Sequence, residues 1–320
     1  MSRTLWTWGR FAGSAAIIAI LVWRLGTSPF LHGVRTVDAA ALAAATGIGV
    51  VTTLCCAWRW RIVAGGLGVE LSLPAAVAAY YRSLFLNVTL PGGVVGDVHR
   101  GVSHGRDVSD VGRALRAVAW ERFAGQVVQG ILTVIVLLAL PSPVHSSMPL
   151  VALGVLVAVV CVVPLVRIRR AGGASAWTRI RSAVAGDIRH VMLARKAWPA
   201  IAFASVVIVL GHATTFLIAA RTAGVSASLS TMAPLALLVM AVMVLPSVGG
   251  WGPREGATAW AFGAAGLGAS RGVATAVVYG VMVLVASLPG AAVLVVSWSR
   301  RARPAERSEQ RQLREGAAHA

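Results

Sequence analysis

The chain has 320 residues, of which 57% are hydrophobic and only 12% are charged, whereas an average soluble domain has about 25% charged residues. This composition, with a mean hydropathy of +0.77, excludes an ordinary soluble enzyme as well as a disordered chain. The formal net charge of +18 points to membrane topology and anionic lipids rather than to nucleic acid.

The apolar residues form blocks close in length to the about 20 residues that cross a hydrocarbon core. We expect the first block to be an uncleaved span, because no small-x-small cleavage site follows it. The sequence therefore predicts an all-α polytopic integral membrane protein. One transmembrane domain covers 1–298, and a flexible, basic cytoplasmic tail follows over 299–320. In chain order the blocks are 11–25, 37–57, 73–90, 124–140, 148–166, 198–220, 231–246 and 272–298.

The distribution of basic residues predicts how the chain is threaded. If 73–110 and 231–268 each enter and leave the membrane on one side, 23 basic residues lie in the cytoplasm and four lie outside. If every block crosses instead, two strongly basic loops face outside, against the positive-inside rule. The first arrangement is therefore favoured. We expect the protein in the plasma membrane, with both termini in the cytoplasm.

This arrangement contains an internal repeat. Residues 11–140 read span, span, hairpin, span, and residues 148–298 read the same but start from the opposite side. Such an inverted-topology repeat is typical of secondary transporters, whose sites lie at the broken helices.

The two predicted hairpin tips have similar sequences. Each has Leu-Pro, then a glycine cluster, then an acidic and a basic residue: Asp97 with Arg100, and Glu255 with Arg254. Proline ends the incoming helix, and the next helix start offers free N–H groups that suit an anion. The sequence therefore predicts two re-entrant hairpins broken by Gly and Pro, rather than simple surface turns.

Three motifs resemble the lysylphosphatidylglycerol synthase transmembrane-region family, also called flippase-like. They are Leu90-Pro-Gly-Gly-x-x-Gly-Asp-x-x-Arg100, Glu121-Arg122, and Leu245-Pro-x-x-x-Gly-Gly-x-Gly-x-Arg-Glu255, and they cover the membrane part over about 10–298. The resemblance implies movement of phospholipids or polyprenyl-linked sugars between leaflets. No aminoacyl-transferase domain follows the last span here, so lipid aminoacylation is not implied.

The resemblance also carries over a set of site residues. At the hairpin tips these are Pro91, Gly92, Gly93, Gly96, Pro246, Gly249, Gly250 and Gly252. Arg100, Arg122 and Arg254 are the candidates to hold a lipid phosphate through bidentate hydrogen bonds, with Arg82 as a second-rank candidate. Asp97, Glu121 and Glu255 are expected to orient or neutralise these arginines. Glu121-Arg122 has a second interpretation, as an interfacial pair that anchors the end of a span.

The leading functional hypothesis is a flippase for an anionic membrane lipid. The rival is a lipid-binding or scaffold protein that serves a membrane-associated transferase without moving lipid, and an intramembrane transferase ranks third. The sequence indicates no metal site, no cofactor and no nucleic-acid partner, and it does not define an oligomeric state. For His212, inside the block 198–220, we expect a hydrogen bond to a neighbouring helix.

Overall fold

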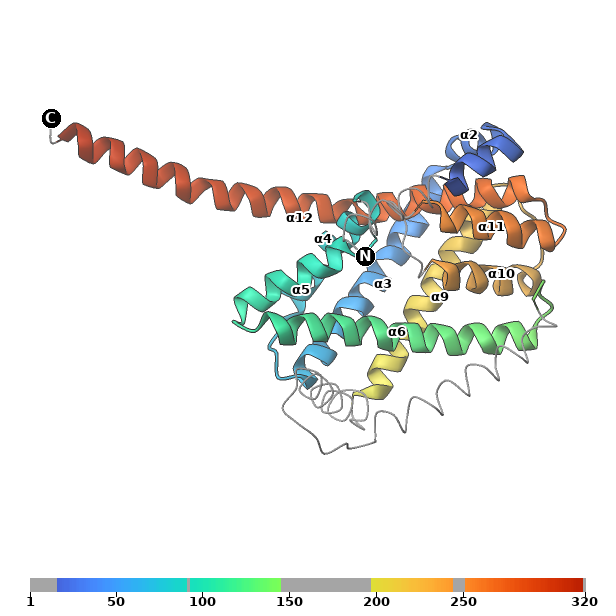
Figure 1. The fold of residues 1–320 in the computed structure, drawn as a ribbon, viewed down its shortest axis with the longest axis horizontal. Coiled ribbons are helices and arrows are strands. Elements are labelled where there is room, and N and C mark those ends of the chain that lie inside the picture. The colour runs from blue at the N-terminus through green and yellow to red at the C-terminus, as the bar shows by residue number, and fades with distance from the viewer. Residues whose placement is uncertain (1–15, 91–92, 145–196, 244–250, 319–320) are drawn as a thin grey trace.

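The structure, a computed structural model, describes residues 16–90, 93–144, 197–243 and 251–318. These ranges are helical and contain no strand, as Figure 1 shows, so the predicted all-α fold is confirmed. Four helices in these ranges are long and apolar enough to cross a membrane, and a bent pair near the N-terminus brings the number to five at most. The predicted span at 148–166 and the basic loop after it lie outside the described residues.

The bent pair consists of a helix over Ala16–Leu25 and α2 (Ser28–Arg35), which meet at 96°. Between the predicted blocks 11–25 and 37–57, the structure therefore has a second short helix. Pro29 in its first turn favours a helix start. Gly33 lets α2 lie directly on the last long helix, since a Cβ there would come 2.8 Å from the carbonyl oxygen of Ala274.

Two spans are longer than the sequence predicts. Helix α3 (Ala39–Gly66) continues nine residues beyond the predicted block, and α6 (Val111–Ala139) begins well before 124. Each is capped by an aspartate, Asp38 or Asp110, whose side chain accepts a hydrogen bond from a backbone N–H of the first turn. Charged residues that the sequence predicts at the ends of spans therefore lie inside these helices. There they contact charged partners on neighbouring helices.

The predicted hairpins appear as two pairs of short helices. The first pair is α4 (Leu73–Thr89) and α5 (Val95–Asp107), and the second is α10 (Leu229–Val242) and α11 (Pro253–Ala264). Gly96 allows α5 to lie against α4, because a Cβ at this position would collide with the backbone of Ser83. The depth of each pair in the membrane stays a prediction.

The remaining helices are α9 (Trp198–Thr222) and α12 (Ala269–Ala318). Only the part of α12 over Ala269–Trp298 has the composition of a span. Where the sequence predicts a flexible tail, the structure continues α12 as a helix that projects from the bundle (Figure 1). The Ala, Arg, Glu and Gln residues of this region favour helix, which explains the continuation.

Corresponding helices of the two halves pack in the same pattern. In the first half, α3 contacts α4 and α6, and α5 contacts α4 and α6; in the second half, α9, α10, α11 and α12 repeat these contacts. Across the halves, α3 lies on α9, α4 on α12 and α10 on α6. An inverted repeat would produce this correspondence, although the direction of each helix through the membrane stays a prediction.

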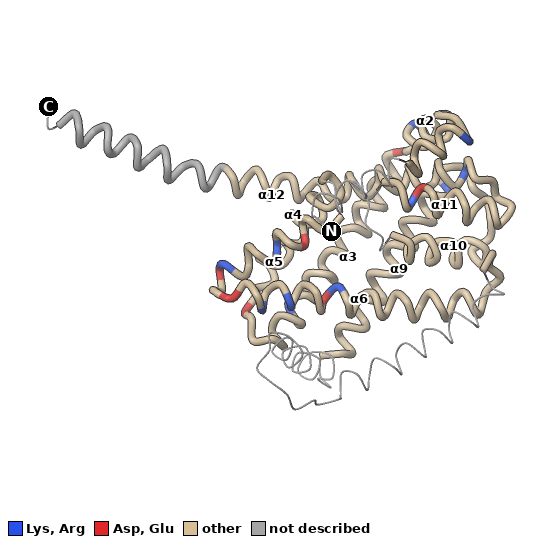
Figure 2. The backbone as a smooth tube through the Cα atoms, in the orientation of Figure 1, with Lys and Arg blue, Asp and Glu red and all other residues tan. Residues whose placement is uncertain are grey.

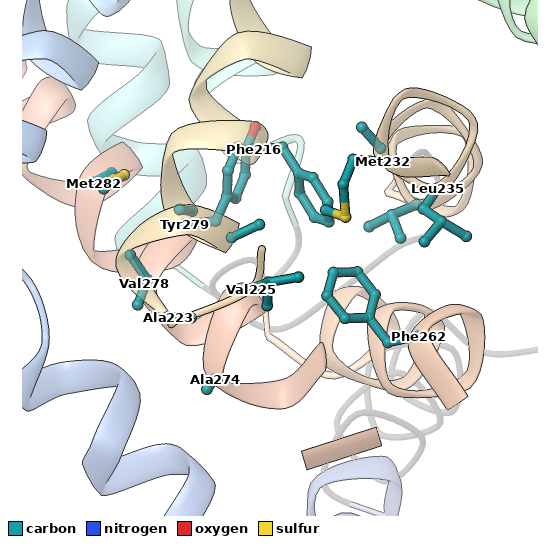
Figure 3. Packing of buried hydrophobic residues seen from close by; sticks show 14 of the residues in the cluster. Phe216, Ala223, Val225, Met232, Leu235, Phe262, Ala274, Val278, Tyr279 and Met282 are labelled. Carbon is teal, nitrogen blue, oxygen red and sulfur yellow. The ribbon is translucent and has the colours of Figure 1, made fainter. Parts of the chain in front are cut away.

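The largest apolar core joins α9, α10, α11 and α12 (Figure 3). Phe216 lies at its centre, with ring centroids 6.2 Å from Phe262 and 6.0 Å from Tyr279. Met232 and Leu235 of α10 close the cluster on the other side. This core fixes α11 against α12, and it therefore positions the second hairpin.

Candidate functional site

The charged residues inside the bundle gather at two places. Figure 2 shows them on α5 with the adjoining part of α6, and near the start of α11. We call the first group the first charged centre and the second group, Arg254 and Glu255, the second charged centre. The first charged centre consists of Arg59, Asp97, Arg100, Glu121 and Arg122.

Glu121 is the most deeply placed carboxylate of the first charged centre, with no exposed surface. It accepts hydrogen bonds from Arg59 Nε at 2.9 Å and from Arg100 Nη2 at 2.7 Å. The hydroxyl of Tyr80 donates a longer bond of 3.4 Å to the same carboxylate. Within the described residues, Glu121 therefore pairs with Arg59 and Arg100 rather than with its neighbour Arg122, and it joins α3, α5 and α6 through buried hydrogen bonds. Its depth in the membrane stays a prediction.

Asp97 lies in the first turn of α5 and links Arg100 to Arg122. It accepts hydrogen bonds from Arg100 Nε at 3.0 Å and from Arg122 Nη2 at 2.7 Å. Ser83 and Asn87 of α4 also donate to it, at 3.2 and 3.1 Å. With four donors around it, Asp97 is held as an ionised carboxylate that fixes the positions of Arg100 and Arg122.

The Arg100 guanidinium is enclosed by aromatic rings as well as by carboxylates. Its central carbon lies 4.6 Å from the ring centroid of Trp60 and 4.4 Å from that of Tyr80. Each such contact contributes about 0.5–2 kcal/mol when it is desolvated. Arg100 is therefore a fixed, fully buried charge rather than a mobile side chain.

Arg122 is the accessible member of this centre. Its side chain is 39% exposed, whereas those of Arg59 and Arg100 are 6% and 0% exposed. Its partner Asp97 is 10% exposed. A ligand that approaches the first charged centre therefore meets Arg122 first.

The second charged centre is built within the first turn of α11. Arg254 Nε and Nη2 both donate to Glu255 Oε1, at 2.9 and 2.6 Å, and the other carboxylate oxygen accepts from the backbone N–H of Gly252 at 2.7 Å. Gly252 precedes the helix with φ at 104°, a value that favours glycine. The Arg254 guanidinium lies 5.8 Å from the ring of Tyr279, whose hydroxyl is 3.4 Å from His212 Nδ1.

In each half, a glycine on the last span makes room for a guanidinium. A Cβ at Gly125 of α6 would lie 2.6 Å from Arg59, and a Cβ at Gly280 of α12 would lie 2.5 Å from Arg254. A larger residue at either position would displace the arginine, since neither helix can move without losing its packing. These glycines belong to the charged centres as much as the arginines do.

An open groove of about 530 Å³ lies beside the second charged centre, between the helix Ala16–Leu25 and α11. It touches Gly256, next to Glu255, and its lining is apolar apart from Arg24. The apolar lining of this groove suits a hydrocarbon chain.

The structure brings together Asp97, Arg100, Glu121 and Arg122 at the first hairpin and Arg254 with Glu255 at the second. Five predicted tip residues lie outside the described residues: Pro91 and Gly92 of the first hairpin, and Pro246, Gly249 and Gly250 of the second. Gly93 has φ at 63°, as expected for a glycine in the turn between α4 and α5. Arg82 is half-buried on α4, next to Ser83.

Sequence reasoning missed Arg59, Trp60 and Tyr80. It also missed Gly125 and Gly280, the two glycines that make room for a guanidinium. Arg59 was assigned to a cytoplasmic loop after a span ending at 57. The apolar residues Ile62, Val63 and Ala64 that follow it were the signal that the helix continues and that Arg59 needs a buried partner.

Comparison with known proteins agrees with the fold. No curated protein sequence matches the chain. Residues 8–290 match the family described as the lysylphosphatidylglycerol synthase TM region, which covers the described helices as far as the middle of α12. With most of the chain matched, several helices able to span a membrane and the predicted motifs in place, this protein is a multi-pass membrane protein that belongs to the lysylphosphatidylglycerol synthase TM region family.

Proposed function

We propose that this protein moves an anionic lipid, a phospholipid or a polyprenyl-phosphate-linked lipid, between the leaflets of the plasma membrane. The observation that carries the proposal is the half-exposed Arg122, held by Asp97 at the edge of a buried centre that has three guanidiniums and two carboxylates. Arg122 is the first positively charged side chain that an approaching phosphate meets. Before a lipid binds, Arg122 is paired with Asp97.

Two further features support the proposal. The family name links the chain to proteins of lipid metabolism. The groove beside the second charged centre offers an apolar surface for an acyl chain, with Arg24 as its charged lining residue. A lipid could therefore keep its chains in hydrocarbon while its phosphate contacts an arginine.

Arg122→Gln should lower the rate of lipid movement at least tenfold, because Gln keeps a polar amide but is shorter and loses the charge that a phosphate needs. The measurement is a leaflet assay in reconstituted vesicles with fluorescent phosphatidylglycerol. Arg113→Gln is the matched control, since Arg113 lies on the same helix, is 46% exposed and pairs with Asp110 three residues before it. Normal lipid movement by the Arg122 variant would contradict the proposal.

The same assay separates the rival function. A scaffold for a membrane-associated transferase would bind labelled lipid and leave its leaflet unchanged. Wild-type protein that binds phosphatidylglycerol but moves it no faster than empty vesicles would favour that rival.

The threading of the chain can be tested independently of lipid. We expect single cysteines at Ile180 and Gln310 to be labelled from the cytoplasm and those at Phe30 and Ser226, which is exposed beside the buried Val225, from outside, in a chain whose native cysteines are replaced. The reason is the positive-inside distribution of Arg and Lys. External labelling at Ile180 would overturn the inverted repeat, because that loop fixes the parity of the crossings.

A further inference from the structure

Nitrogen atoms of three side chains in and around the first charged centre are buried but have no hydrogen-bond partner among the described residues. They are Trp60 Nε1, Arg100 Nη1 and Arg122 Nε, and each carries a hydrogen to donate. Trp60 and Arg100 have no exposed surface at all. Buried donors are almost always paired in native proteins, so three of them at one centre require an acceptor.

The three donors belong to side chains that lie together. The Arg100 guanidinium stacks on the Trp60 ring at 4.6 Å, and Arg100 and Arg122 share the carboxylate of Asp97. The imidazole of His104, one turn after Arg100, packs edge-on against Trp60 with ring centroids 5.7 Å apart. Its Nε2 atom also lacks a partner in the described part of the chain.

The charge balance of the centre, like its unpaired donors, indicates that an anion binds there. Three guanidiniums face two carboxylates, so the centre carries one surplus positive charge, and its exposed edge is Arg122. A single negative charge that binds at this edge neutralises the centre through charge-assisted hydrogen bonds. A dianion would overcompensate the centre, and a neutral headgroup would leave the surplus in place.

We propose that Trp60 Nε1, Arg100 Nη1 and Arg122 Nε form an oxyanion site that selects a ligand with one negative charge, such as a phosphodiester. This inference rests on the proposed function for the source of the ligand, because an anionic lipid headgroup and a free phosphate share this chemistry. Trp60 is then a specificity-determining residue that neither the sequence motifs nor the ion pairs identify. The oxyanion enters past the exposed Arg122 and reaches the buried donors when Arg122 releases Asp97.

Trp60→Phe tests the site because it removes the N–H donor and keeps an aromatic ring under Arg100. Titration of the detergent-purified protein with phosphatidylglycerol, followed by native mass spectrometry, should show binding about tenfold weaker than in the wild type. Without lipid, the variant should lose little thermal stability, because removal of the unpaired buried donor offsets part of the cost of the smaller ring in this fully buried position. Trp198→Phe, a change at a tryptophan that is 55% exposed at the start of α9, should leave binding unchanged.

Two further probes test whether the site selects a single negative charge and whether its ligand is a lipid or free phosphate. Phosphatidylcholine, whose headgroup is neutral overall, should bind at least tenfold more weakly than phosphatidylglycerol. If inorganic phosphate, titrated at a pH below its second ionisation where it is mainly the monoanion, binds with the same dependence on Trp60 while phosphatidylglycerol does not bind, the oxyanion site stands and the lipid function fails. If phosphatidylglycerol binds equally to the wild type and the Trp60→Phe variant, the site is wrong even where lipid movement is normal.

Discussion

Glu121→Ala should prevent most of the protein from folding. The change leaves Arg59 and Arg100, both buried, without their common carboxylate, and breaking one buried pair in this way costs about 3–5 kcal/mol. A typical domain has a total stability of only about 5–15 kcal/mol. The measurement is the yield of monodisperse protein in detergent, together with the midpoint of thermal unfolding.

Two further variants make this result specific. Glu70→Ala removes an exposed carboxylate just after α3 and should change stability by less than about 0.5 kcal/mol. Adding Arg59→Met to Glu121→Ala removes one of the stranded charges and should recover part of the yield. If Glu121→Ala is as stable as Glu70→Ala, the network around Glu121 does not hold the bundle together.

Arg254→Ala should abolish lipid movement. The substitution removes the guanidinium at the second hairpin and leaves Glu255 with only the backbone N–H of Gly252 as its partner. Arg254→Lys should remain impaired, because an ammonium keeps the charge but cannot make both hydrogen bonds to Glu255. It also cannot fill the space beside Gly280 that the guanidinium occupies. Rates are compared in reconstituted vesicles at equal amounts of folded protein.

The double variant Arg254→Ala with Glu255→Ala separates a structural role from a functional one. If the pair only stabilises the fold, removing both charges restores folding and lipid movement together. If Arg254 acts on lipid, the double variant folds but moves no lipid. A well-folded Arg254→Ala protein with the normal rate of lipid movement would remove Arg254 from the site.

The sequence predicted the helical membrane fold, the two broken hairpins and the family, because apolar block length and Pro-Gly punctuation are local signals. It also singled out Asp97 with Arg100 and Arg254 with Glu255, which the structure places in direct contact. It could not pair Glu121 with Arg59, 62 residues earlier, because local periodicity contains no information about which helices become neighbours.

The lengths of α3 and α6 were underestimated for a related reason. A charged residue in an apolar run is ordinarily evidence that the span has ended. Arg59 and Glu121 neutralise each other across two helices, so the runs continue through them. The role of Gly125 and Gly280 in making room for an arginine could not be predicted either, since glycines in membrane spans commonly serve helix packing.

The two charged centres differ in what they connect. The first centre joins α3, α4, α5 and α6 and, through the hydrogen bond from Arg59 to Ser205, also α9. Sliding α5 along its neighbours would break several buried ion pairs at once. The second centre closes its ion pair within α11, and close packing holds this helix against α12, where a Cβ at Gly272 would lie 2.5 Å from the carbonyl oxygen of Thr258. The first hairpin is therefore held to the bundle by charge as well as by shape, whereas the second is held mainly by shape, and changes in side-chain volume should affect the second hairpin most.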